Sequence, residues 1–187
     1  MKNEWAFGVD PEHWLPIPPA DQLNDERKSV WIERATALAA RANLAEPEEI
    51  EVLRTRCSEI LESADLREAC AFFPVMEGGP VRAEMTTLPA SEWQSQLDVW
   101  QRRDADTRNW DSTPFEHEVF ADAQRVMRVD DSPSGAVMFS VAFLGHDDFR
   151  LFVLSLTTDN PLVAGQFGAF GKPVFLSFRA LDAAVHG

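Results

Sequence analysis

Two short histidine-containing segments hold the residue types best able to do chemistry in this sequence. His117 lies between Glu116 and Glu118, and His146 is followed by two aspartates. Imidazole nitrogens and carboxylate oxygens are common ligands of divalent metals, so these segments suggest a metal-dependent hydrolase. The candidate ligands are His117, His146, Asp147 and Asp148.

The spacing within these segments argues against a metal site. On a strand, Glu116 and Glu118 face the side opposite to His117, because successive side chains alternate between the two faces. The sequence also lacks the HExxH motif, which holds two imidazoles on one face of a helix. We therefore expect no bound metal, no cofactor and no catalytic residue, and place the histidines in an edge strand and a solvated turn.

A glycine-rich segment near the C-terminus resembles a phosphate-binding loop only in composition. In residues 165–172 (GQFGAFGK) the glycines are spaced three and three, and Pro173 follows the lysine where the phosphate-binding motif needs Ser or Thr. We expect a loop that tucks Phe167 and Phe170 under a sheet. A mobile flap that binds a partner is the alternative.

Aromatic residues outside the predicted helices could anchor a protein partner. Three of the six tryptophans fall on the apolar stripes of predicted helices and fill the core, whereas the other three lie in the N-terminal arm or in loops. Trp110, between Asn109 and Asp111, has the polar and acidic surroundings typical of an interface anchor. The expected partner-binding residues are Trp5, Trp14, Trp110, Phe167 and Phe170.

The composition limits the kind of partner. The chain has 187 residues, 17 basic and 31 acidic side chains and a formal net charge of −14. This charge is spread along the sequence, repels nucleic acid and favours a protein partner with a basic face. No secretory signal or membrane span is evident, and Cys57 and Cys70 read as buried thiols, so we expect a cytoplasmic bacterial protein.

The remaining pattern predicts a single α+β domain over residues 1–187. An extended Pro-rich arm (1–20) precedes a helical hairpin (21–66) and an antiparallel sheet of about five to six strands with helices on its faces (67–187). We expect helices at 22–43, 47–62, 173–185 and within 89–103, the last capped by Ser91 and Gln94, and a polar loop at 103–114. The expected strands are 68–76, 81–88, 116–129, 135–145 and 149–158, with the arm as a further edge strand and with a helix as the alternative for 115–127.

The arm motif P-x-x-W-L-P-I-P and residues 118–129, 136–145 and 149–161 resemble a known group of proteins. These are uncharacterised proteins of high-GC Gram-positive bacteria with a PsbP-like sheet, a fold shared by lumenal photosystem subunits and a Ran-binding import factor. The resemblance covers residues 68–187. It implies a strongly bent antiparallel sheet with helices on both sides and an interaction role, and carries over no catalytic residue. The predicted helices at 22–62 have no counterpart in that fold.

These observations favour a non-catalytic protein–protein interaction protein, such as an adaptor, an immunity factor or an accessory factor. A metal-dependent hydrolase built on His117 and His146 is one alternative. A carrier that holds a small ligand in a cavity between the sheet and its helices is the other.

Overall fold

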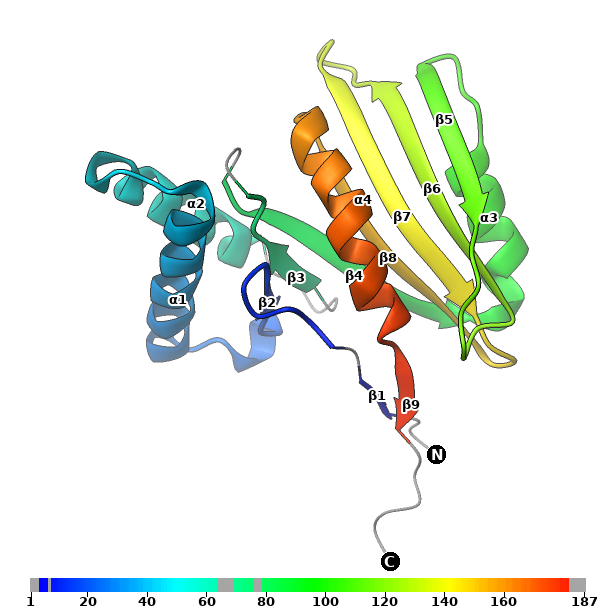
Figure 1. Cartoon of the computed structure of the whole chain (residues 1–187), viewed down its shortest axis with the longest axis horizontal. Helices are drawn as coiled ribbons and strands as arrows, with labels where there is room; N and C mark the ends of the chain where they lie inside the picture. The colour runs from blue at the N-terminus through cyan, green and yellow to red at the C-terminus, as the bar shows by residue number, and fades with distance from the viewer. Residues whose placement is uncertain (1–3, 7, 64–68, 76–78, 182–187) are drawn as a thin grey trace, which may run out of the picture.

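Seven strands form one antiparallel sheet in the computed structural model of this chain, which describes residues 4–6, 8–63, 69–75 and 79–181 (Figure 1). The strand order is β2-β3-β4-β8-β7-β6-β5, and β1 and β9 pair in a separate small sheet. The strands are β1 (Glu4–Ala6), β2 (Trp14–Ile17), β3 (Ala69–Phe72), β4 (Val81–Pro89), β5 (Thr107–Pro114), β6 (Asp122–Asp131), β7 (Val137–His146), β8 (Arg150–Thr158) and β9 (Arg179–Leu181). The helices are α1 (Asp25–Asn43), α2 (Ile50–Glu62), α3 (Trp93–Gln101) and α4 (Pro161–Leu176).

The α+β class and the antiparallel sheet are confirmed, but the predicted count of five to six strands is too low. The additional strand is β5, in a segment whose polar composition predicts a loop. Trp110 and Ser112 are half-buried between exposed neighbours, and β5 pairs with β6 along its length. An antiparallel strand needs to bury only one face, so low hydrophobicity does not prevent residues 107–114 from joining the sheet.

The segment that we predict to be a glycine-rich loop is helix α4. The Asn160 side chain accepts hydrogen bonds from two backbone N–H groups of the first turn, and Pro161 occupies the first helical position. Both features favour the start of a helix. The helix predicted over 173–185 is wrong in its bounds, because α4 ends at Leu176 and residues 179–181 form strand β9. Residues 182–187, which include His186, lie outside the described part of the chain.

Helix α4 covers one face of the sheet and α3 covers the other (Figure 1). On β7, Phe143 packs beneath α4, whereas its neighbours Ala142 and Leu144 pack with Trp93 and Leu97 of α3. This alternation is the period of two expected of a strand that is buried on both faces. The core under α4 is rich in aromatic side chains, which include Phe72, Phe120, Phe152, Phe167, Phe175 and Phe178.

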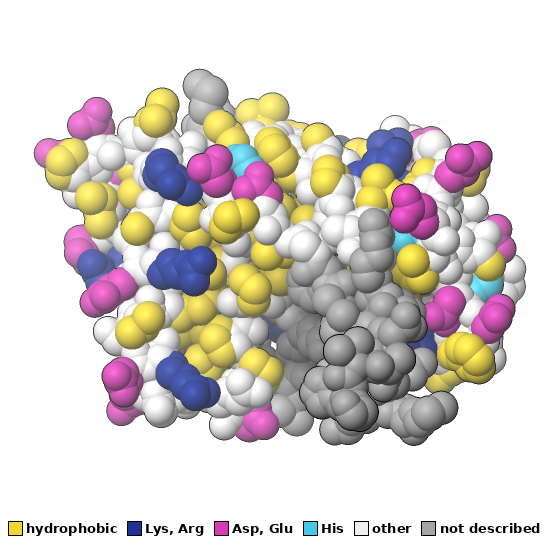
Figure 2. All heavy atoms as spheres, turned by 60° about the horizontal axis from the view of Figure 1, so that its bottom comes forward, with side chains coloured by type: hydrophobic (Ala, Val, Ile, Leu, Met, Phe, Trp, Pro, Cys, Tyr) yellow, Lys and Arg dark blue, Asp and Glu magenta, His cyan; other side chains and the backbone are white. Residues whose placement is uncertain are grey.

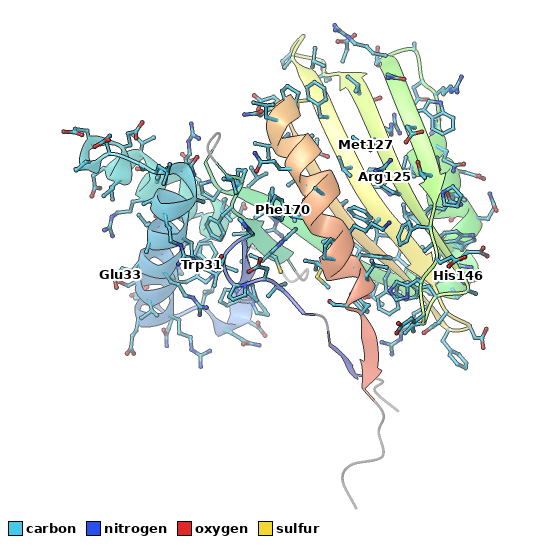
Figure 3. All side chains as sticks on the ribbon, in the orientation of Figure 1. Trp31, Glu33, Arg125, Met127, His146 and Phe170 are labelled. Atoms are coloured by element: carbon cyan, nitrogen blue, oxygen red, sulfur yellow. The ribbon has the colours of Figure 1, made fainter. Side chains whose placement is uncertain are left out.

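Helices α1 and α2 pack on the strands at the opposite end of the sheet from β5 (Figure 1). Trp31 of α1 is buried, and its indole Nε1–H donates a hydrogen bond to the Pro16 carbonyl, 2.8 Å away (Figure 3). Cys57 of α2 is buried in the same cluster. The predicted edge strand in the arm is confirmed as β2, which contains Pro16 and is the last strand at this end.

Two local predictions fail near helix and strand starts. Helix α3 begins at Trp93 after a short 3-10 turn, and no side chain caps it, so the predicted Ser91 capping box is absent. The strand preferred over 116–129 is right only from Asp122, because residues 115–121 form an irregular link rather than a strand or the alternative helix.

Candidate functional site

An open pocket lies between α4 and the strands that this helix leaves uncovered. Helix α4 packs over β7 and β8, and β6 and β5 extend beyond it (Figure 1). The pocket has a volume of about 310 Å³, and we call it the α4–β5 pocket. Its lining comes from four elements: Asn109, Trp110 and Asp111; Met127, Arg128 and Val129; Phe139, Ser140 and Val141; and Pro161, Ala164 and Gly165.

The pocket is apolar because of strand alternation and of small residues on the helix. Met127, which is labelled in Figure 3, and Phe139 are half-buried and pack against the edge of the main core on the α4 face of the sheet. On the helix side, a Cβ added at Gly165 would meet no atom within 4 Å. The space beside Gly165 is therefore available to a ligand or to a side chain of another molecule.

The segment that supplies β5 and β6 contains more acids than bases. Residues 104–131 carry eight acidic and three basic side chains. Each of the three arginines forms an ion pair within this region: Arg108 with Asp131 at 2.6 Å, Arg125 with Asp111 at 3.3 Å, and Arg128 with Asp130 at 2.9 Å. Over residues 104–131 five negative charges remain in excess, although Glu116 and Asp122 of this segment line a different pocket.

The Arg108–Asp131 pair joins the start of β5 to the end of β6. The hydrogen bond from Arg108 to the Asp131 carboxylate, with the opposite charge of that group, raises the pKa of Arg108. Because both side chains are largely exposed, this pair contributes little to stability.

Trp110 lies on β5 and not in a loop, and it is half-buried. The Arg103 guanidinium lies over its ring, 4.7 Å from the centroid. The indole Nε1 is buried and has no hydrogen-bond partner among the described residues. Trp110 is therefore partly accessible, and its β5 backbone borders the α4–β5 pocket.

Two other predicted partner-binding residues belong to the core instead. Trp14 is 1% exposed and Phe167 is 0% exposed, and their rings lie 5.7 Å apart against Phe72. These side chains stabilise the contact between β2, β3 and α4, and a partner could not reach them. Phe170 is half-buried, with its ring 4.4 Å from that of His13. Trp5 lies on β1, but its side chain is not described.

The two candidate metal ligands His117 and His146 lie on opposite faces of the sheet. The ring of His117 contacts Phe175 of α4, whereas that of His146 contacts Trp93 of α3. Within residues 4–6, 8–63, 69–75 and 79–181, no group of three or more His, Cys, Asp or Glu side chains could hold a metal ion. The structure therefore does not bring the predicted ligands together.

Each histidine instead has a structural environment. His117 Nδ1 accepts hydrogen bonds from the backbone N–H groups of Val119 and Phe120, at 3.0 and 3.3 Å, and Nε2 lies 3.0 Å from the Phe175 carbonyl. This arrangement requires the neutral tautomer with its proton on Nε2. His146 Nδ1 lies 3.0 Å from the Asp147 carbonyl. The Asp147 carboxylate accepts hydrogen bonds from the backbone N–H groups of Phe149 and Arg150 in the turn that follows.

The two cysteines belong to different sides of the sheet. Cys57 packs with α1 and β2, whereas Cys70 packs in the core under α4. They are not joined by a disulfide. Burial raises the pKa of the Cys57 thiol, which keeps it protonated and poorly reactive at neutral pH.

No helix within the described ranges is long and apolar enough to cross a bilayer.

Comparisons with known proteins add no assignment to this geometry. No protein-family model matches the chain, and no curated protein matches its sequence.

Proposed function

We propose that this protein is a non-catalytic binding protein, such as an adaptor, an immunity factor or an accessory factor, that docks a protein partner with a basic face. The observation that carries this proposal is the α4–β5 pocket, an open apolar pocket lined in part by Asp111 on a protein with a net charge of −14. Protein interfaces place anchor side chains in such pockets and surround them with polar groups.

The charge distribution supports a basic partner. With a net charge of −14, to which residues 104–131 contribute −5, the protein attracts a positively charged surface over a distance of about 10 Å at ~0.1 M salt. Acidic side chains are also spread over the face seen in Figure 2. Electrostatic attraction of this kind raises the association rate, and added salt lowers it. The resemblance to proteins with a PsbP-like sheet also implies an interaction role.

A comparison of three immobilised baits tests this proposal. The baits are the wild type, Gly165→Met, which fills the pocket, and Ala169→Met, which places the same side chain on the exposed part of α4. We expect one protein of the host cell to bind to the wild type and to Ala169→Met. Its binding should fall at high salt and should be lost with Gly165→Met. Failure of all three baits to retain any protein above empty resin would refute the proposal.

The pocket also supports a second candidate, a small-ligand carrier. A volume of about 310 Å³ lies at the lower end of the ~300–1,000 Å³ typical of small-molecule sites. Native mass spectrometry of the purified protein distinguishes the two. A carrier retains an apolar molecule that Gly165→Met lacks, whereas a protein-binding module has the mass of the chain alone.

A further inference from the structure

We infer that the partner contributes an extended basic segment, which pairs with β5 as an added strand and places an apolar side chain in the α4–β5 pocket. This inference rests on the proposed function and specifies how the same site binds. Addition of a strand to an open sheet edge gives affinity through backbone hydrogen bonds and specificity through pockets for alternate side chains.

The backbone of β5 has one side available for such pairing. The sheet order ends with β5, and among the described residues only β6 pairs with it. The Phe115 N–H donates to the Ala123 carbonyl at 3.0 Å, which fixes the phase of the antiparallel ladder. Successive residues of a strand direct their N–H and C=O groups to alternate sides. The groups of Asp111 and Thr113 therefore point towards β6, and those of Trp110 and Ser112 point away from it.

The opposite edge of the sheet offers much less. Strand β2 has four residues, and its Pro16 has no N–H to donate. Proline and shortness are the usual means by which a sheet edge is protected from pairing. Strand β5 has eight residues, and its only proline is the last, Pro114. The two edges of this sheet therefore differ in their capacity to accept a strand.

The pocket adjoins this open edge. Asn109 and Asp111 of β5 form part of its lining, and Gly165 of α4 borders it from the other side. Neighbouring strands lie about 4.8 Å apart, so a long apolar side chain on an added strand can extend across β5 into the pocket. Leu, Met and Phe have the required length, and alternate residues of the segment would face the opposite side.

Charge selects the occupant. A second copy of this chain would bring another net charge of −14, which the first copy repels. A segment rich in Lys or Arg instead meets the Asp111 carboxylate, which is 61% exposed although it pairs with Arg125 at 3.3 Å and accepts a hydrogen bond from the Thr113 hydroxyl at 3.0 Å. The observations therefore favour a basic segment of a different protein.

Selection from a random 12-residue peptide library displayed on phage tests this inference. We expect peptides that alternate basic and apolar residues to be enriched on the wild type. With a synthesised peptide bound, amide exchange measured by NMR should slow at Trp110 and Ser112 and stay unchanged at Asp111, which already faces β6. Protection of a different surface, or binding by a dimer of this chain, would overturn the inference.

Two variants and one modified peptide complete the test. Gly165→Met should weaken peptide binding by about tenfold or more, whereas Ala169→Met should bind as the wild type does. A peptide methylated on the backbone nitrogens that face β5 should lose affinity, and methylation on the other edge should have no effect. If the bait experiment captures a basic protein but no peptide protects Trp110 and Ser112, strand addition is wrong and the proposed function stands. If neither experiment shows binding, both are wrong.

Discussion

Gly171 of α4 lies directly against the ring of Phe143 on β7. A Cβ at position 171 would lie 2.8 Å from Cε2 of this ring, and Phe143 is fully buried. The helix therefore approaches the sheet more closely than any other residue would allow. Gly168, on the same helix, has no atom within 4 Å of an added Cβ.

These two glycines give a matched pair of substitutions. Gly171→Ala should lower the free energy of unfolding by about 1–3 kcal/mol, because the added methyl overpacks the core. Gly168→Ala should raise it by about 0.5–1 kcal/mol, because alanine favours the helix and the space is open. Urea unfolding of both variants measures the difference, and equal effects would contradict the close approach.

His117 should matter for stability rather than for catalysis. His117→Ala removes the partner of two backbone N–H groups and of the Phe175 carbonyl, so we expect a loss of about 1–3 kcal/mol. ¹⁵N NMR at neutral pH should show Nδ1 without a proton and Nε2 with one. A stability like that of the wild type, or a doubly protonated ring, would disagree with these hydrogen bonds.

Divalent metals should leave the protein unchanged. Because His117 and His146 face α4 and α3 respectively, Zn²⁺ or Mn²⁺ has no shared site to bind at these residues. We expect the thermal midpoint to stay the same when either metal is added to protein purified without chelators. A rise that disappears in the double variant His117→Ala/His146→Ala would revive the hydrolase hypothesis.

Gln166 of α4 binds the backbone just beyond β3 with both ends of its amide. Its Oε1 accepts from the Val75 N–H at 2.6 Å, and its Nε2 donates to the Val75 carbonyl at 2.8 Å. Gln166→Met removes both hydrogen bonds, and Gln166→Glu keeps the acceptor but places a carboxylate oxygen against the Val75 carbonyl, which repels it. We expect Gln166→Met to lose about 2 kcal/mol in chemical denaturation and Gln166→Glu to lose at least as much, and a stability like that of the wild type would contradict this geometry.

Cys57 should make stability fall at alkaline pH. Desolvation by burial raises the pKa of its thiol, so this group stabilises the fold fully below the pKa of the unfolded chain, about 8.5. The contribution is lost as pH rises through the higher folded pKa, because the unfolded chain then ionises more readily. Unfolding measured from pH 7 to 10 should show a decline that Cys57→Ala reduces.

The sequence predicts the strands and helices that have a clear pattern of apolar residues. It does not predict those that form only because a neighbouring strand or helix packs against them. Strands β7 and β8 fall within two residues of their predicted bounds, because both are buried on two faces and read as long apolar runs. The sequence does not predict β5, because the half-buried residues of this strand are polar apart from Trp110. Residues 107–114 form a strand because they pair with β6.

The α4–β5 pocket could not be predicted from the sequence for a related reason. It depends on where α4 lies across the sheet, which is decided by contacts such as Gly171 with Phe143. The glycines of this segment suggested a loop, since glycine weakens an isolated helix. In the folded chain Gly171 permits close packing and Gly165 leaves space, so the residues that misled the prediction are those that shape the pocket.

The pairing of β1 with β9 joins residues near the two ends of the sequence, with Glu4 opposite Leu181. Beside this pair, the Ser177 hydroxyl accepts from the Gly8 N–H at 2.7 Å and lies 3.0 Å from the Gly8 carbonyl. During synthesis on a ribosome, β1 emerges before β9 and cannot pair with it until residue 181 has left the exit tunnel. This small sheet therefore forms only after residue 181 has been synthesised, whereas the hairpin of β6 and β7 can assemble once residue 146 has emerged.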